Sequence, residues 1–323
     1  MRLPAISFAL CFVIINACSQ TTTSGNSSVR AVFVASTPCD AVSKTLLQIP
    51  PGDGSELMIW NLTLYQDSKT FAPADYTLIC RYGLPKQGTK GFMEGSKTIT
   101  LEGKWSIGIG THENPSAVVY KLNADSSGIS LSFLQPDPNL LHLLDADKRL
   151  MIGTGAWSYT LNRIDPVPVA HPGLVTRKLS TLPVTNDSGV VGIFGGRTPC
   201  NHIVRELNNI DAVGCQITKW RVTLYQDSVS HIPTDFRLET IYVGKGDNRY
   251  TNTGKWVLSR GTKVDPEAIV YQMQLDQGKP ELTLNFLKAD DNILFFLDKD
   301  RSLLVGDRYT GYTLNRTNKG LRH

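Results

Sequence analysis

The two halves of this chain repeat one another, and no other feature of the sequence limits the possible folds as strongly. The string from Trp60 to Ser68 corresponds to that from Trp220 to Ser228, and Tyr-Thr-Leu-Asn-Arg at 159–163 recurs unchanged at 312–316. Two shorter strings also match: Thr37-Pro38-Cys39 with Thr198-Pro199-Cys200, and Gly103-Lys104-Trp105 with Gly254-Lys255-Trp256. Because the strings keep their order, we expect two copies of one domain.

Within each copy, apolar and polar residues alternate as they do in strands that bury one face. Trp60, Leu62 and Leu64 alternate with less apolar neighbours, and the pattern recurs at Trp220 and Leu224. Short strands separated by Gly, Pro and Asp turns predict an antiparallel meander. Each copy has room for about eight strands, the number at which a sheet closes into a small barrel. The predicted fold class is therefore all-β, with two tandem small antiparallel meander β-barrels.

The repeat divides the chain into six parts. We expect a signal peptide at 1–17, a lipidated tether at 18–30, a first barrel at 31–164, a linker at 165–190, a second barrel at 191–316 and a tail at 317–323. The linker begins with Asp165-Pro166-Val167-Pro168, a composition typical of irregular chain. The first copy has nine extra residues between Tyr82 and Gly103, which predicts an insertion in a loop.

The first residues predict export and lipid attachment. The stretch from Leu3 to Ile15 is apolar but short for a bilayer span, as in a signal peptide. The following Asn16-Ala17-Cys18 completes a segment that resembles the lipobox of bacterial lipoproteins, in which the Cys receives the lipid. The resemblance implies lipidation of Cys18, and Ser19 in place of Asp implies an outer-membrane destination. Ordinary secretory cleavage is the alternative.

A series of short motifs occurs in the same order in both copies. In the second copy the series comprises Gly195-Gly196-Arg197-Thr198-Pro199-Cys200, Thr223-Leu224-Tyr225, Gly254-Lys255-Trp256, Val270-Tyr271 and Leu297-Asp298. This series resembles the N-terminal domain of the NlpE family, bacterial lipoproteins of copper resistance and envelope stress. The resemblance implies lipocalin-like barrels and a role in the cell envelope. The Cys-x-x-Cys of that family is incomplete here, because Val42 and Ile203 stand where its second Cys would be.

After loss of the signal peptide and lipidation, four cysteines remain as disulfide candidates: Cys39, Cys80, Cys200 and Cys215. A Cys200–Cys215 bond would close a short loop between the first two strands of the second copy. A Cys39–Cys80 bond would join the first turn of its copy to the third strand. An exported chain favours oxidation. The alternative is buried free thiols, since Cys80 shares a strand face with Leu78.

No group of residues predicts a reaction. The His residues are scattered, and Cys200-x-His202 has no counterpart in the first copy, so we expect no metal site. Asp145-x-Asp147 is better explained by a hairpin turn. The sequence contains no P-loop, dinucleotide fingerprint or Gly-x-Ser-x-Gly elbow, and its net charge of +4 is too small to indicate nucleic-acid binding. We therefore predict that the protein is not an enzyme and has no cofactor.

Inward-facing aromatic residues are the candidates for ligand binding. They are Trp60, Trp105, Tyr120, Trp220, Trp256 and Tyr271. In a small barrel they either line an apolar cavity or fill the core. The first outcome favours a carrier of a small hydrophobic ligand or a metal ion. The second favours an envelope protein that acts by binding or contact, with a protein partner and a membrane anchor, as in envelope-stress or surface sensing.

Overall fold

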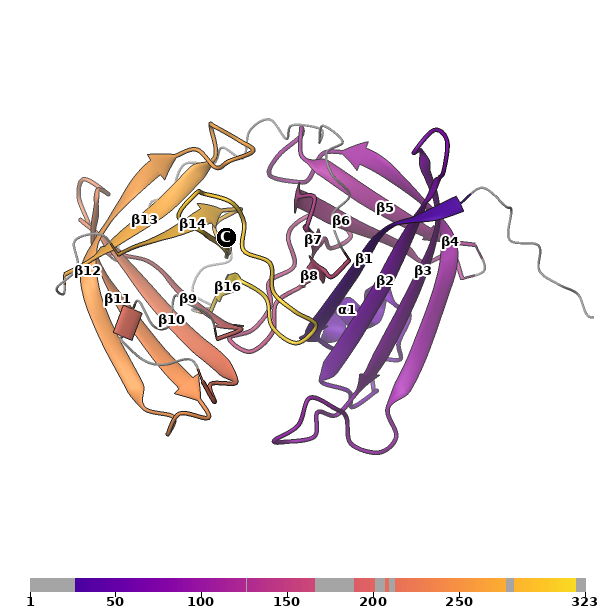
Figure 1. Cartoon of the computed structure of the whole chain (residues 1–323), viewed down its shortest axis with the longest axis horizontal. Helices are drawn as coiled ribbons and strands as arrows, with labels where there is room; N and C mark the ends of the chain where they lie inside the picture. Colours follow the sequence, from indigo (N-terminus) through magenta and orange to yellow (C-terminus); the bar gives the residue numbers. More distant parts are fainter. Residues whose placement is uncertain are drawn as a thin grey trace, which may run out of the picture.

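The computed structural model describes residues 27–125, 127–165, 189–200, 207–208, 213–276 and 282–317, and it confirms the predicted all-β fold of two closed barrels (Figure 1). The first barrel contains β1 (Ser27–Pro38), α1 (Ala41–Leu46), β2 (Leu57–Asp67), β3 (Pro73–Gly83), β4 (Lys97–Ile109), β5 (Val118–Ala124), β6 (Ser130–Asp137), β7 (Leu140–Leu143) and β8 (Thr160–Arg163). The second contains β9 (Val190–Thr198), β10 (Ile217–Gln226), β11 (Pro233–Val243), β12 (Arg249–Arg260), β13 (Ile269–Leu275), β14 (Thr283–Lys288), β15 (Ile293–Leu297) and β16 (Thr313–Arg316).

Both barrels are antiparallel meanders that close through their first and last strands. Each strand pairs with its neighbour in the chain, and the ring closes where β1 pairs with β8 and β9 with β16. The period of two sets which side chains enter the core, so that Trp60, Leu62 and Leu64 of β2 are fully buried. The equivalent residues of β10, among them Trp220 and Leu224, belong to the core of the second barrel.

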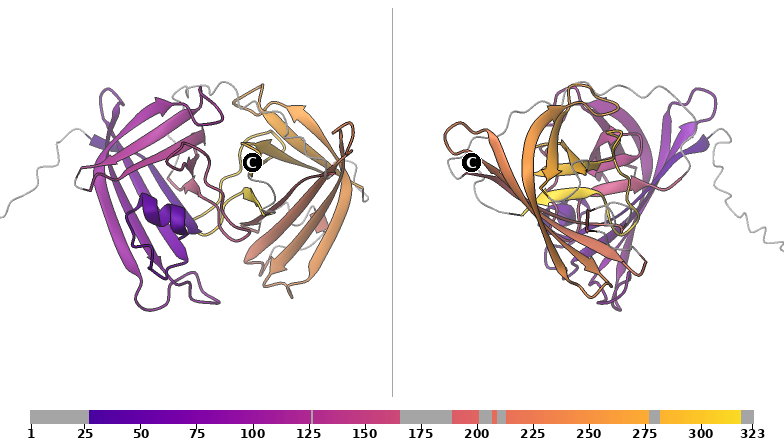
Figure 2. Two further views of the ribbon diagram at one scale, coloured as in Figure 1. Left: turned by 180° about the vertical axis from the view of Figure 1, so that it is seen from behind. Right: turned by 60° about the vertical axis from the view of Figure 1, so that its left-hand side comes forward.

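Capped turns support the strand ends. The carboxylate of Asp145 accepts hydrogen bonds from the backbone N–H groups of Asp147 and Arg149, and Asp298 does the same for Asp300 in the second copy. The structure thus confirms that these acids belong to hairpin turns. The short helix α1 is capped by the side chain of Asp40 and lies on the first barrel (Figure 2).

Three predicted boundaries are wrong by a few residues. The predicted tether at 18–30 overlaps β1, because Ser27 and Ser28 already pair with β2. The predicted linker at 165–190 overlaps the first barrel at Asp165, whose carboxylate accepts the N–H of Val32 and pairs with Arg163. It also includes Val190, the first residue of β9.

Several predicted features lie outside the described residues. These are the signal peptide, Cys18, the tether as far as residue 26, the linker at 166–188 and the tail at 318–323. In the part of the chain that the structure describes, no helix has the length and apolar character needed to cross a bilayer.

The two barrels are docked side by side through their outer faces (Figures 1 and 2). A third apolar cluster lies between the two cores and contains residues of both barrels. It includes Ala117, Val119, Leu134, Leu140, Leu144 and Leu150, together with their equivalents Ala268, Val270, Leu287, Ile293, Leu297 and Leu303. Since equivalent residues meet, the two copies are related by an approximate twofold axis.

Candidate functional site

The predicted ligand-binding aromatics fill the barrel interiors. All six are buried, with at most 4% of any one exposed. Trp105 packs on Tyr120 with ring centres 5.0 Å apart, and Trp256 packs on Tyr271 at the same distance. Their packing agrees with the second of the two expectations, a filled core.

Each of these indole N–H groups already has an acceptor inside the protein. Trp60 donates to the hydroxyl of Thr37 at 2.8 Å, and Trp220 donates to Thr198 at the same distance. Trp105 donates to the backbone carbonyl of Tyr65 on β2, and Trp256 donates to the equivalent carbonyl of Tyr225 on β10. The polar edges of these side chains are therefore used in folding.

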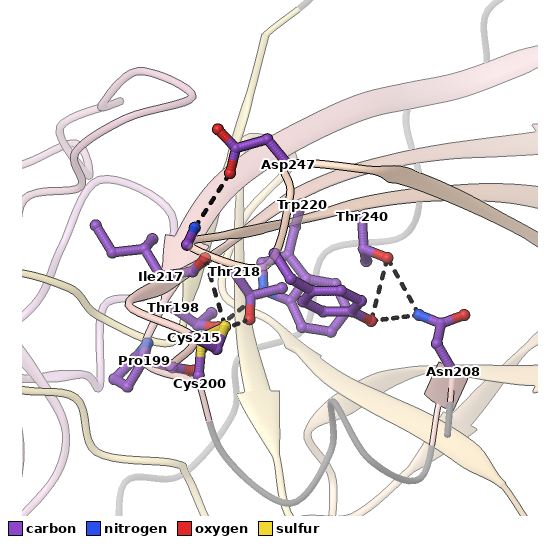
Figure 3. The surroundings of a disulfide bond; sticks show 12 residues. Thr198, Pro199, Cys200, Asn208, Cys215, Ile217, Thr218, Trp220, Thr240 and Asp247 are labelled. Carbon is purple, nitrogen blue, oxygen red and sulfur yellow. Dashed lines mark hydrogen bonds between the residues drawn. A yellow bond between two sulfur atoms is a disulfide. The ribbon is translucent and has the colours of Figure 1, made fainter. Parts of the chain in front are cut away.

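The Cys200–Cys215 disulfide is present and joins the end of β9 to the start of β10 (Figure 3). The Sγ atom of Cys200 also lies 3.5 Å from the hydroxyl of Thr218. This bond confirms the first of the two predicted pairings. It closes a loop rather than forming a reactive site.

The second predicted pairing, Cys39 with Cys80, is not formed, and both residues are buried free thiols. Both side chains lie in the apolar core of the first barrel, and Cys80 of β3 lies opposite Trp60 of β2. Burial raises the pKa of Cys39 to about 11 and that of Cys80 well above its usual value. Both thiols therefore stay protonated and unreactive at neutral pH.

No cluster of three or more His, Cys, Asp or Glu side chains that could hold a metal ion occurs among the described residues. His142, at the contact between the barrels, is fully buried, and burial lowers its pKa to about 4. Its two ring nitrogens lie 2.9 Å from the hydroxyl of Thr160 and from the carbonyl of Met151. His202 lies outside the described residues.

Reciprocal hydrogen bonds hold the two barrels together. The side chain of Asn162 accepts the N–H of Gly306 at 2.8 Å and donates to the carbonyl of Asp307 at 2.9 Å. Asn315, its equivalent, accepts the N–H of Gly153 at 2.8 Å and donates to the carbonyl of Thr154 at 3.2 Å. Each asparagine is therefore hydrogen-bonded to the loop that precedes the last strand of the opposite barrel.

The approximate twofold axis passes near a contact between equivalent threonines. The hydroxyls of Thr160 and Thr313 lie 2.9 Å apart and are both buried. A Cβ added to Gly153 would lie 2.2 Å from a backbone carbonyl oxygen of the same loop, and a Cβ added to Gly306 would lie 2.1 Å from one. Only glycine therefore fits at these two positions, where each loop folds back on itself.

Beside these threonines, a small cleft with room for about one water molecule opens between the last loops of the two barrels. In Figure 1 the loop before β16, drawn in yellow, reaches toward the first barrel. The cleft is lined by Ser36, Ala156, Trp157, Ser158, Thr160, Asn162, Gly196, Arg197, Tyr309, Thr310, Gly311, Thr313 and Asn315. Its walls combine hydroxyl and amide groups with two aromatic rings and one cation.

Arg197 carries the positive charge of this lining. It lies on β9 with its guanidinium carbon 5.9 Å from the ring centre of Trp157 in the other barrel. Its Nε is buried without a hydrogen-bond partner, and burial lowers the pKa of the guanidinium. The cleft thus offers a partly desolvated cation without a carboxylate beside it in the lining.

Arg197, Trp157 and Tyr309 were not among the predicted site residues. A signal for them exists in the repeat itself. Thr160 and Asn162 are identical to their equivalents Thr313 and Asn315, whereas Arg197 corresponds to Ser36 and Trp157 to Thr310. The copies also differ at positions away from the cleft, such as His142 and Phe295, so the differences alone do not locate it.

Comparison with known proteins adds no identification. No protein-family model, curated protein or solved structure matches the chain.

Proposed function

We propose that this chain is a lipid-anchored protein of the bacterial cell envelope that acts by binding rather than by catalysis. It would be attached through Cys18 to the outer membrane, with its two NlpE-like barrels acting as one body. Envelope-stress or surface sensing is the role we assign to it. The observation that carries the proposal is the docking of two filled barrels around a shared polar cleft.

Two features support binding at a surface shared by the barrels. The predicted interior aromatics are packed in the cores and their N–H groups are paired, which leaves a carrier role inside either barrel without support. The outer faces, in contrast, meet through an apolar cluster and reciprocal hydrogen bonds. Such an interface fixes the position of one barrel relative to the other, and binding sites often form at the contact between two domains.

Cell fractionation tests the anchoring. The wild-type chain should sediment with membranes, because each buried methylene of a lipid chain contributes about 0.8 kcal/mol. The Cys18→Ala variant should be released. Since an uncleaved apolar leader could itself retain that variant, a second variant carries a cleavable secretory leader in place of residues 1–18. Membrane retention of this second variant would contradict the proposal.

A stress reporter tests the sensing role. Overproduction of the wild-type chain should raise expression from an envelope-stress promoter, and the unanchored variant should do so less. Equal reporter expression with both, at equal protein levels, would contradict sensing at the membrane.

A further inference from the structure

We propose that the end of the molecule at which the chain enters β1 lies against the bilayer and inserts the tips of two β-hairpins among the lipid headgroups. This entry end comprises Ser27, the β2–β3 turn at 67–72 and the β10–β11 turn at 227–232. The surface that covers it is the membrane that holds the lipid anchor. The contact therefore rests on the anchoring through Cys18 that is part of the proposed function, and it adds an orientation to that anchoring.

The segment between the lipidated cysteine and the first barrel is short. Eight residues separate Cys18 from Ser27, the first residue of β1. Such a segment spans at most about 30 Å even when it is fully extended. β1 itself has 12 residues, which makes it about 40 Å long. A lipid on Cys18 would therefore restrain the entry end to the neighbourhood of the bilayer, whereas the opposite end is free of that restraint.

Both hairpin turns lie at the entry end. Ser27 pairs with Asp67, the residue that opens the β2–β3 turn, so the chain enters the first barrel directly beside this turn. The approximate twofold axis places the equivalent β10–β11 turn of the second barrel at the same end. In Figures 1 and 2 the two turns project there, one from each barrel, while the β3–β4 loop at 84–96 lies at the opposite end. The molecule thus presents two equivalent projections to a surface that faces its entry end.

Apolar side chains are exposed at both tips. Phe71 in the first turn is 46% exposed, and in the second turn Val229 is 87% exposed and Ile232 62%. Val29 near the start of β1 and Ile164, which directly follows the neighbouring strand β8, are also exposed. Exposed apolar side chains gathered on one surface indicate an interaction site. The boundary between headgroups and acyl chains is a surface into which such side chains partition.

The two turns reach an apolar tip with different residues. Val229 and Ile232 stand where the first copy has Lys69 and Ala72, and Phe71 stands where the second copy has a histidine. The backbone, in contrast, is held in the same way in both. The carboxylate of Asp67 accepts the N–H groups two and three residues ahead at 3.0 and 2.8 Å, and Asp227 does so at 3.0 and 2.7 Å. Because the tips are preformed, little conformational freedom is lost when they insert.

Charge at the tips does not favour an anionic partner. Hydrogen bonds from the turns lower the pKa of Asp67 and of Asp227, so both carboxylates stay ionised at neutral pH. Lys69 offsets the first of them, and the turn at 227–232 contains no Lys or Arg. Attraction to anionic lipid headgroups needs an excess of cations. The contact is therefore apolar, and it should form on neutral lipids and persist in high salt.

Fluorescence quenching on the lipidated full chain in phosphatidylcholine vesicles tests the contact. A polarity-sensitive fluorophore is attached to Val229→Cys, and flotation first shows that the chain is bound to the vesicles. The wild-type chain should take no label, because Cys39 and Cys80 are buried and Cys200 is bonded to Cys215. The label at position 229 should lose roughly half of its emission to nitroxide-bearing phospholipids, since interfacial apolar side chains sit about 5 to 10 Å into the headgroup boundary.

Met93→Cys is the matched control, because Met93 is an exposed apolar residue of the β3–β4 loop at the opposite end. The label at position 93 should not be quenched. Apolar insertion is separated from mere nearness by adding Phe71→Ser and Ile232→Ser to the chain labelled at position 229, which should reduce the quenching at least about twofold. Leu84→Ser, an exposed change in the β3–β4 loop, should leave it unchanged. Urea unfolding checks that each variant remains folded.

Four outcomes would overturn the contact. In protein that floats with the vesicles, equal quenching at positions 229 and 93, undiminished quenching in the serine variant, or loss of quenching in high salt would each overturn it while leaving the anchoring intact. Protein that does not float would contradict the anchoring, and the contact with it. Flotation and quenching therefore distinguish failure of the proposed function from failure of the contact.

Discussion

At the scale of single residues, His142 differs from its equivalent in the second copy more than most core residues do. Its counterpart is Phe295, and the two rings meet edge to face with centres 5.7 Å apart. The neutral imidazole satisfies both neighbours if Nε2–H donates to the carbonyl of Met151 and Nδ1 accepts from Thr160. Protonation would remove that acceptor and place a charge in the apolar contact between the barrels.

We therefore expect His142 to make stability depend on acid pH. Its pKa is lowered from 6.5 to about 4, so between these values the unfolded chain binds more protons than the folded one. Titration of His142 leaves the free energy of unfolding unchanged above about pH 6.5 and lowers it as the pH drops toward 4, by about 3 kcal/mol in total. Urea unfolding across this range measures the loss.

The matched comparison is His142→Gln, which cannot titrate, with His112→Gln at the exposed His112 as control. As the pH falls from 6.5 to 4, the stability of the wild-type chain should drop relative to that of His142→Gln, whereas the wild-type chain and His112→Gln should change together. Asp137 and Asp290, whose pKa values burial raises to about 6, contribute with the opposite sign, but they do so equally in all three proteins. An unchanged slope in His142→Gln would contradict the assignment.

Copper binding is also decided by individual residues. Cu(I) needs two or more converging thiolates or similar soft ligands. Cys200 and Cys215 are joined to each other, and burial keeps Cys39 and Cys80 protonated. We expect the oxidised protein to bind Cu(I) no more tightly than about micromolar. Competition with a chromogenic Cu(I) chelator measures this, and nanomolar binding would contradict it.

At the scale of elements, the two copies use different means to fix the connection between their first two strands. In the first copy, α1 follows β1 and is capped by Asp40, whose carboxylate accepts the N–H of Ser43 at 3.0 Å. In the second copy, the Cys200–Cys215 disulfide spans a sequence separation of 15 residues. A cross-link of this kind stabilises mainly by limiting the unfolded chain.

Replacement of both Cys200 and Cys215 by Ser should lower the free energy of unfolding of the second barrel by about 3 kcal/mol. Urea unfolding followed by tryptophan fluorescence measures the change. Reductant should produce a similar loss in the wild-type chain and no further loss in the double variant. A free thiol at Cys200, found by mass mapping without reduction, would contradict the prediction.

At the scale of the whole molecule, the duplication has produced the equivalent of a symmetric dimer within one chain. Equivalent strands β5–β7 and β13–β15 supply the apolar contact, and equivalent asparagines supply its hydrogen bonds. An isologous contact of this kind matches one surface against itself. The cleft beside the axis is therefore a property of the pair and not of either barrel.

Asn162→Ala and Asn315→Ala should each destabilise the docked pair, because both residues are almost fully buried and each leaves two backbone groups of the opposite loop unpaired. We expect a loss of about 1 to 3 kcal/mol for each change. Urea unfolding measures it, and Asn248→Ala at an exposed turn should have little effect. Equal stability of all three variants would show that the asparagines do not hold the barrels together.

Much of the fold was predictable from local patterns. Trp60, Leu62 and Leu64 identify the inner face of a strand because side chains of a strand alternate with period two. The sequence indicates the docking of the barrels less clearly. Val118 and Val119 are consecutive apolar residues, and Val119 lies in the contact between the barrels while Val118 lies in the first core. Such a break in the alternation indicates a strand buried on both faces, but it does not identify the covering surface.

By itself the sequence determined the duplication and the strand faces and predicted the barrel closure, because each depends on short-range order or on two matched copies. It left the pairing of the cysteines open, and the structure shows the Cys200–Cys215 bond. Only the tertiary structure decided that the aromatic cores are filled and that Arg197 faces Trp157. Those outcomes depend on how closed sheets pack and on which outer faces meet. Residues far apart in the chain come together there through contacts that no local period encodes.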